Sequence, residues 1–445
     1  MNLKTIGQKV AVYGAFLVLA GIAIDAMHYV GNEAAGRTRP LPLKLTKIVI
    51  LMRHGVRSPT QSQKKLSQWS NRKWPTWTEA PGDLTKKGFV LARMMAEGIR
   101  KYYGTHGLPM KAGCAAHNDV YVYADNMERT IATGRAVFEG FYPGCRLAPA
   151  HMASGKDPLF HAIKMSACPV DNKIATRKVK RKLATVLAKS HQLDVDLAKM
   201  RVVLCPKSGN RKEVCGLSRR TKVISAKHGA VHGALHVASA VGEAFLMEYA
   251  EGKPLEQVAW GDVRSVHAMK AMLYPHNVYS AITRREAYIA NHGGTLLVQA
   301  IDLLLGGSRQ PKSNKTAPAP YRRAKVVILI GHDVNIAHVA AMMNMRWVLR
   351  GQPDMTPPDM ALAFDLYRNK GGGPGLVGVR LFYQTLASMR KASLGKGKAR
   401  PLMETLTLKG CNKGPQHDLC TVSQFQKIAR QHMVPGCRLQ SAWLQ

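Results

Sequence analysis

The sequence has few acidic residues: 27 Asp and Glu stand against 65 Lys and Arg, giving a formal net charge of +38. Such an excess creates a positive field that concentrates anionic partners, whether nucleic acid, an anionic lipid surface or a polyphosphorylated small molecule. The basic residues are scattered, with runs at 177–182, 219–222 and 391–400, and no known nucleic-acid-binding module accompanies them. We therefore expect no nucleic-acid partner, and each run taken alone is better explained as solvated surface.

Low-complexity stretches are few and internal repeats are absent, which argues against a disordered chain or a repeat protein. Hydrophobic residues make up 46% of the sequence, enough to bury a core. A length of 445 residues allows two or three ordinary domains. The sequence therefore predicts a globular protein.

The sequence also lacks any CxxC pair, which disfavours a zinc site among its cysteines. An even set of cysteines without that spacing is typical of disulfides formed in an oxidising compartment, and eight cysteines allow 105 pairings. The eight are Cys114, Cys145, Cys168, Cys205, Cys215, Cys411, Cys420 and Cys437.

The N-terminal segment resembles an export signal. Lys4 and Lys9 precede an apolar stretch over 10–24, which is short for a full membrane span. No small-x-small cleavage site is clear, so residues 1–36 are interpreted as either a signal peptide or a membrane anchor. We expect a periplasmic or secreted protein.

Three short apolar runs rich in β-branched residues predict buried parallel strands at 48–52, 120–123 and 326–330. Polar side chains follow each run: Arg53 and His54 the first, Arg129 the second, and Asp333 the third. Ligands of open α/β sheets bind outside the carboxyl ends of strands, so these side chains are expected in one site.

Between the second and third strands, the spacing of Ala, Leu, Val and Met predicts helices at 194–199, 228–251, 260–272 and 281–305. Residues 306–320 are interpreted as the loop that returns to the sheet. We expect an α/β domain at 44–165 and 310–445, with a mainly α-helical domain inserted at 166–309.

The three strand ends hold what phosphate-ester hydrolysis requires: charge stabilisation, a nucleophile and a proton for the leaving oxygen. Arginine grips phosphate in bidentate fashion and keeps its charge, which suits Arg53, Arg57 and Arg129. A neutral His54, oriented through one ring nitrogen, can attack with the other, and Gly55 lets the backbone come close to a ligand.

Asp333, beside His332, can protonate the leaving oxygen if bound substrate keeps its carboxyl protonated. Single residues have simpler explanations. Asp333 alone could cap a helix, Arg129 could close a structural ion pair, and Pro59 with Thr60 could begin a helix. The joint pattern favours a catalytic site.

These residues resemble a known family. Segment 53–59 matches the RHGxRxP motif and 332–333 the HD motif of the histidine acid phosphatases, most similar to bacterial periplasmic phytases and acid phosphatases. The likeness extends over about 44–437 and includes segments 74–77, 84–88, 125–130, 157–160, 276–277 and 351–358.

The resemblance implies a phosphoglycerate-mutase-like parallel sheet with an inserted helical domain, and hydrolysis through a phosphohistidine. It implies no metal or other cofactor, a small phosphorylated substrate and a monomer. It implies His54 as nucleophile, Asp333 as acid, and Arg53, Arg57, Thr60, Arg129 and His332 as phosphate ligands. The disulfides it suggests are Cys114–Cys145, Cys168–Cys437, Cys205–Cys215 and Cys411–Cys420.

Two positions depart from the family phytases. Gln61 stands where they commonly carry Lys, and Val334 where they tend to have Thr. The expected activity is hydrolysis of phytate and other phosphomonoesters at acidic pH. Alternatives are a general or sugar-phosphate phosphatase, a phosphate mutase of the same superfamily, and a non-catalytic basic envelope protein that holds polyanions.

Overall fold

The computed structural model describes residues 43–205, 215–217, 225–227, 230–306, 320–392, 401–411 and 418–439. The apolar segment 10–24 and nearly all of the loop 306–320 lie outside these residues, as do the basic run 219–222 and most of the run 391–400. None of the helices it describes has the length and apolarity needed to cross a bilayer.

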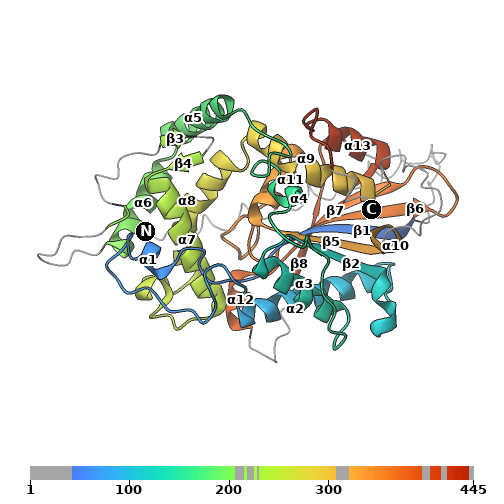
Figure 1. The fold of residues 1–445 in the computed structure, drawn as a ribbon, viewed down its shortest axis with the longest axis horizontal. Coiled ribbons are helices and arrows are strands. Elements are labelled where there is room, and N and C mark those ends of the chain that lie inside the picture. The colour runs from blue at the N-terminus through green and yellow to red at the C-terminus, as the bar shows by residue number, and fades with distance from the viewer. Residues whose placement is uncertain are drawn as a thin grey trace, which may run out of the picture. The chain divides into compact units, whose positions relative to one another are not determined.

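A mixed seven-stranded sheet organises one side of the molecule (Figure 1). Its strand order is β2-β5-β1-β6-β7-β8, with β9 pairing with β7. Strands β2, β5 and β1 run parallel, whereas all pairings from β1 through β6 to β9 are antiparallel. The strands are β1 (Leu43–Arg53), β2 (Val120–Ala124), β5 (Val326–Gly331), β6 (Ala361–Asn369), β7 (Leu376–Tyr383), β8 (Leu402–Leu406) and β9 (Leu419–Thr421).

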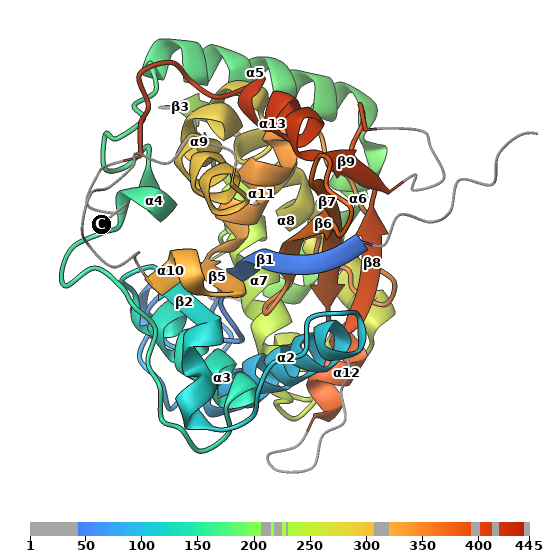
Figure 2. The same ribbon diagram turned by 90° about the vertical axis from the view of Figure 1, so that its right-hand side faces the viewer.

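Helices cover both faces of this sheet, which explains why residues 48–52 of β1 and all of β5 are buried and apolar (Figure 2). On one face lie α9 (Ala287–Leu304), α11 (Asp333–Met342) and α13 (Val422–Arg430). On the other lie α2 (Lys86–Thr105) and α3 (Glu128–Phe141). The short elements α4 (Pro158–His161), α10 (Pro320–Arg323) and η1 (Cys114–Asp119) complete this side, whereas α12 (Leu386–Lys391) packs into the apolar core of the helical side.

The other side is mostly helical and has an apolar core of its own between α7 and α8 (Figure 1). Its elements are α1 (Gln63–Leu66), α5 (Asn172–Lys189), α6 (His191–Leu204), β3 (Ser225–Lys227), β4 (Ala230–His232), α7 (Ala234–Glu251), η2 (Val258–Gly261) and α8 (Val266–Thr283). Side-chain caps start several of them: Asp171 accepts from the Ile174 amide at 2.8 Å, and Ser265 from the Ala268 amide at 3.1 Å.

The three predicted strands are confirmed, and each ends one residue later than predicted. Strands β2 and β5 also begin where they were predicted to begin, whereas β1 begins five residues earlier. The expected helix over 281–305 is two helices, because α8 ends at Thr283 and the Glu286 side chain caps the start of α9. Helix α5 and the antiparallel strands β6–β9 were not predicted. The division into an α/β domain at 44–165 and 310–445 and a helical domain at 166–309 stays a prediction.

All eight cysteines are paired, and the four disulfides are those that the family resemblance implied: Cys114–Cys145, Cys168–Cys437, Cys205–Cys215 and Cys411–Cys420.

Backbone hydrogen bonds hold the carboxyl ends of β1, β2 and β5 together. The His54 amide donates to Gly331 O and the Asp125 amide to Ile330 O, both at 2.9 Å. The Arg53 amide donates to Met360 O, also at 2.9 Å. The polar residues that follow the three strands therefore start from adjacent points at one edge of the sheet.

Candidate active site

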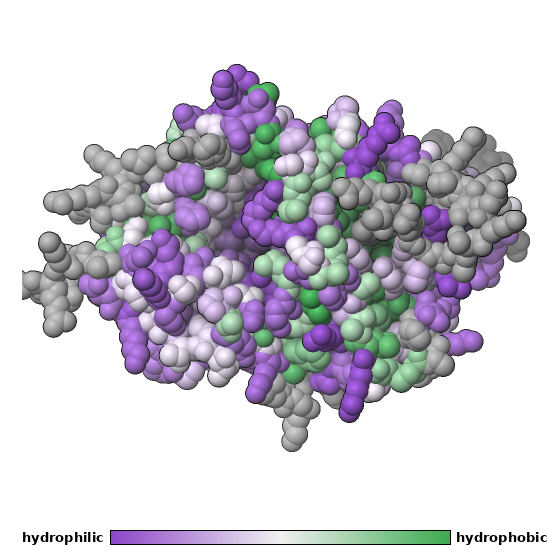
Figure 3. All heavy atoms as spheres, in the orientation of Figure 1, coloured by the Kyte–Doolittle hydropathy of each residue, from purple (hydrophilic) through white to green (hydrophobic). Residues whose placement is uncertain are grey.

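A pocket of about 610 Å³ lies at this edge and is lined by residues from both sides of the molecule. Hydrophilic side chains gather around the hollow near the centre of the face that Figure 3 shows. Six of the seven predicted site residues line the pocket: His54, Arg57, Thr60, Arg129, His332 and Asp333. Arg53 is fully buried and does not line it.

The His54 ring is held in the orientation that a nucleophile requires. Its Nδ1 lies 2.9 Å from Gly55 O, which can only accept, so Nδ1 carries the proton and Nε2 is left with its lone pair. Burial, followed by the charges of Arg129 and Arg53, holds the pKa of His54 well below its usual 6.5. Burial and the neighbouring guanidinium charges therefore both favour the neutral ring, which is the form that a nucleophile requires.

Two glycines allow the loop that carries His54 to pack closely. A Cβ on Gly55 would lie 2.9 Å from Asp359 Oδ1 and 3.0 Å from Gly88 O. A Cβ on Gly88, near the start of α2, would lie 2.0 Å from Val56 O. Close approach of protein segments is thus one reason for a glycine at position 55.

Glu243 of α7 joins two of the arginines. Its Oε1 accepts from Arg53 Nη2 at 2.7 Å and from Arg57 Nη2 at 2.9 Å. Arg53 also contacts Asp354 Oδ2 at 3.0 Å and the carbonyl of Thr356. Burial opposes ionisation, but Arg57 and Arg53 outweigh it and lower the pKa of Glu243 to about 2. The pair of guanidinium groups is therefore held in place by an ionised carboxylate.

A second carboxylate orients His332. Asp125 Oδ2 accepts from His332 Nε2 at 2.6 Å and from His161 Nε2 at 2.8 Å. This leaves His332 Nδ1 near Arg129 Nη2, at 3.5 Å. Burial favours the neutral form of Asp125, but the two imidazole hydrogen bonds outweigh it and hold the Asp125 pKa below its usual value. The other His332 nitrogen and Arg129 thus face the pocket together.

Asp125, His161 and His332 together also have the donor set of a metal site, with ligand atoms within 4.8 Å of one another. Both imidazole Nε2 atoms donate hydrogen bonds to the carboxylate, which accounts for the arrangement without an ion. A metal would have to displace both Nε2 protons and would lie close to Arg129. The residues present therefore fit a hydrogen-bonded group better than a metal centre.

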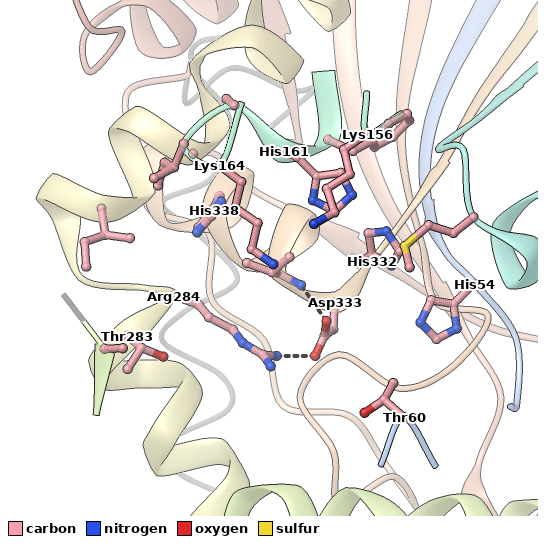
Figure 4. Close-up of a pocket in the computed structure, with 18 of the residues that line it drawn as sticks. His54, Thr60, Lys156, His161, Lys164, Thr283, Arg284, His332, Asp333 and His338 are labelled. Atoms are coloured by element: carbon pink, nitrogen blue, oxygen red, sulfur yellow. Dashed lines mark hydrogen bonds and ion pairs between the residues drawn. The ribbon is translucent and has the colours of Figure 1, made fainter. Parts of the chain in front are cut away.

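Asp333, the first residue of α11, lies across the pocket from His54 (Figure 4). Its Oδ1 accepts from the Val334 amide at 2.8 Å, and its Oδ2 makes an ion pair with Arg284. The N-cap position of the helix belongs to His332, so Asp333 is not the cap. Burial opposes ionisation, but Arg284 and then Arg53 outweigh it and hold the pKa of Asp333 well below its usual 3.8.

Several pocket residues were not predicted: Lys156, His161, Lys164, Glu243 and Arg284. Lys156 and Lys164 point into the pocket near His332 and Asp333 (Figure 4). Sequence gives little signal for Glu243 or Arg284, which lie on or beside apolar helices far along the chain from the motifs. Of the two departing positions, Val334 lines the pocket, whereas Gln61 does not.

Comparisons with known proteins agree with this geometry. Residues 44–228 match the profile of the histidine phosphatase superfamily (branch 2). Phytase AppA of Escherichia coli is 30% identical over 410 residues, covering 89% of this chain and 94% of that protein. A glucose-1-phosphatase of Salmonella typhimurium is 26% identical and covers 92% of this chain and 98% of its own length.

The structure of Hafnia alvei phytase in complex with myo-inositol hexakis sulphate superposes with a TM-score of 0.79 at 32% identity. The match covers 90% of this chain and all of that one. The chain therefore belongs to the histidine phosphatase superfamily, branch 2. Within it, the chain is a phosphomonoester hydrolase of the histidine acid phosphatase type.

Proposed function

We propose that this hydrolase cleaves phytate and other phosphomonoesters at acidic pH, with His54 as nucleophile and Asp333 as proton donor. The observation that carries the proposal is the His54 ring, which is fixed through Nδ1 and presents Nε2 to a pocket that Arg57, Arg129 and His332 also line. A phosphate group placed there meets a nucleophile and charge-stabilising donors at once.

In the first step, His54 Nε2 forms a bond to phosphorus while the bond to the ester oxygen breaks. The departing oxygen receives a proton from Asp333, on the opposite side of the pocket. Water then attacks phosphorus, the P–Nε2 bond breaks, and the Asp333 carboxylate takes up the proton of that water. Arg57, Thr60, Arg129 and His332 hold the transferred phosphate, whereas the buried Arg53 supports Arg57 from behind through their shared partner Glu243.

Phytate is favoured by the relatives named as phytases and by the charge of the pocket, which five cationic side chains line: Arg57, Arg129, Lys156, Lys164 and Arg284. The glucose-1-phosphatase relatives and Val334 at the pocket wall keep a sugar phosphate as the second candidate substrate. Four disulfides support export to an oxidising compartment. We also propose that residues 1–36 act as a signal peptide or a membrane anchor and that the protein is a monomer.

The test is phosphate release near pH 5 from phytate, glucose 1-phosphate and an aryl phosphate, measured side by side. Release mainly from phytate supports the proposal, and release only from the simple esters makes the protein a general phosphatase. His54→Ala should abolish both release and an acid-labile, base-stable phosphoenzyme. A protein that releases no phosphate and forms no 32P-labelled phosphoenzyme would instead be a binding protein.

The role of Asp333 has a separate test. Asp333→Asn should lower kcat/KM, which reports formation of the phosphoenzyme and not the later attack of water, far more for esters with poor leaving groups than for nitrophenyl phosphate, whose leaving oxygen hardly needs a proton. Equal slowing of both substrates would remove Asp333 from the acid role.

A further inference from the structure

Arg284 occupies an unexpected place in the pocket, beside the group proposed as proton donor. It is the C-cap residue of α8, in the short connection between α8 and α9, and its Nη1 contacts Asp333 Oδ2. Asp333 is the one side chain within the described residues that hydrogen-bonds to it. Both side chains are mostly buried, at 19% and 12% exposed.

This ion pair conflicts with the chemistry required of Asp333. A carboxylate paired with a buried guanidinium is stabilised in its ionised form, whereas cleavage of an ester with a poor leaving group requires the protonated form. An acid that is ionised in the empty pocket must lose its partner before it can donate a proton. The substrate is the natural agent for that change, because it brings negative charge to Arg284.

Figure 4 shows where that charge would lie. His54 lies on one side of Asp333, and Arg284 and Lys164 lie on the other. A scissile phosphate at His54 points its ester oxygen toward Asp333, so the rest of the substrate extends toward Arg284 and Lys164. A second phosphate group on a neighbouring carbon therefore comes within reach of both cations.

We propose that Arg284 is a latch that pairs with Asp333 in the empty pocket and moves to a second phosphate group of a polyphosphorylated substrate, freeing Asp333 to take up a proton. The inference rests on the proposed acid role of Asp333. A phosphate group of such a substrate carries at least one full negative charge at acidic pH and accepts a bidentate guanidinium, so it can replace the Asp333 carboxylate as the partner of Arg284.

The proton balance closes over one turnover. When Arg284 leaves, Asp333 takes a proton from the acidic solvent and passes it to the leaving oxygen as the P–O bond breaks and the P–Nε2 bond forms. In the second step Asp333 takes a proton from the attacking water as the P–Nε2 bond breaks. Arg284 then returns to Asp333, and that proton passes to solvent.

Other ionisable groups near Asp333 do not replace Arg284 in this role. Those facing it are Arg53, His54, Arg129, Glu243, His276, Tyr279 and His338. Arg53 is bound to Glu243 and Asp354, and Arg129 lies beside His332 on the phosphate side. Only Arg284, among the residues that the structure describes, makes an ion pair with Asp333.

The experiment compares Arg284→Gln with Arg285→Gln, which removes the same charge one residue away. Arg285 donates to Met345 O and does not line the pocket. Substrates are phytate, glycerol 2-phosphate and nitrophenyl phosphate, each measured from pH 3 to 8. Arg284→Lys serves as the charge-conserving variant.

Without the latch, Asp333 keeps its proton to higher pH. For glycerol 2-phosphate, Arg284→Gln should raise kcat several-fold at pH 5 and move the alkaline limb of the pH profile upward by about one unit. For phytate, kcat/KM should fall about tenfold, because one phosphate contact is lost. The rate of nitrophenyl phosphate hydrolysis by Arg284→Gln should change little, as should all rates of the Arg285→Gln variant. The rates and pH profile of Arg284→Lys should lie between those of the wild type and Arg284→Gln.

Equal changes for glycerol 2-phosphate and phytate, or an alkaline limb that does not move, would overturn the latch. The Asp333→Asn comparison separates this failure from failure of the proposed function. If Asp333→Asn leaves hydrolysis of nitrophenyl phosphate nearly unchanged while Arg284→Gln does not shift the alkaline limb of the pH profile, only the latch is wrong. If Asp333→Asn slows all esters equally, the acid role itself is wrong.

Discussion

Glu248 gives the enzyme a stability that should depend steeply on pH. This residue of α7 is 1% exposed, and its Oε2 accepts from the Ala259 amide at 2.9 Å. That hydrogen bond fixes a turn in which Ala259 and Trp260 both have left-handed backbone angles, with φ of 48° and 57°. Oε1 has no hydrogen-bond partner among the residues that the structure describes, and burial raises the pKa of Glu248 to about 8.

The sign follows from proton binding. Between pH 4.5 and 8 the folded protein keeps the Glu248 proton, whereas the unfolded chain releases it, so the free energy of unfolding falls as pH rises. The loss is about 1.4 kcal/mol per pH unit, or about 3 kcal/mol by pH 7, and it levels off above pH 8. The contribution is fully present only below pH 4.5.

Glu248→Gln removes the titration and keeps an oxygen for the Ala259 amide. Its free energy of unfolding, relative to the wild type, should therefore increase by about 3 kcal/mol between pH 4.5 and pH 7. Guanidinium unfolding of both proteins with disulfides intact, followed by tryptophan fluorescence, measures this difference. A difference that stays constant over that range would refute the reasoning, whatever its size.

Three further outcomes are expected. Gly88→Ala should lower kcat/KM at least about tenfold, because its Cβ would meet Val56 O and displace the loop that carries His54. The control Gly104→Ala in the same helix, where a Cβ meets nothing within 4 Å, should leave kcat/KM unchanged, and equal losses in the two variants would contradict this reasoning. Because Gln61 does not line the pocket, Gln61→Lys should leave kcat/KM for phytate relative to an aryl phosphate unchanged, and a higher ratio would place position 61 against the substrate. Finally, kcat/KM for phytate should fall as ionic strength rises, because the +38 charge steers the substrate; a flat response would exclude steering.

The sequence was sufficient where the signal is local. Residues 48–52 of the strand before His54, and the whole strand before Asp333, are buried on both faces, so each is a continuous apolar run that ends close to its polar residues. Helix α5 also had a local signal, since Ala175, Val179 and Leu183 recur every four residues and are its buried positions. The basic run 177–182 lies between them and obscured that period.

The rest of the site depends on contacts between distant segments. Glu243 and Arg57 are 186 residues apart in the sequence yet form an ion pair. Arg284, at the end of α8, likewise pairs with Asp333 at the start of α11. Neither acidic Glu243 nor basic Arg284 has a neighbour in sequence that reveals its partner. Only the packing of α7 and α8 against the sheet edge brings them to the pocket.

The Cys168–Cys437 disulfide has a consequence for how the chain matures. The other three disulfides join cysteines that follow one another in sequence, but these two are 269 positions apart, and four cysteines lie between them. During vectorial synthesis, Cys205 is the next partner to arrive after Cys168, long before Cys437. An oxidant that joins thiols in order of arrival therefore makes a wrong crosslink, which thiol–disulfide exchange must undo before the native protein is reached.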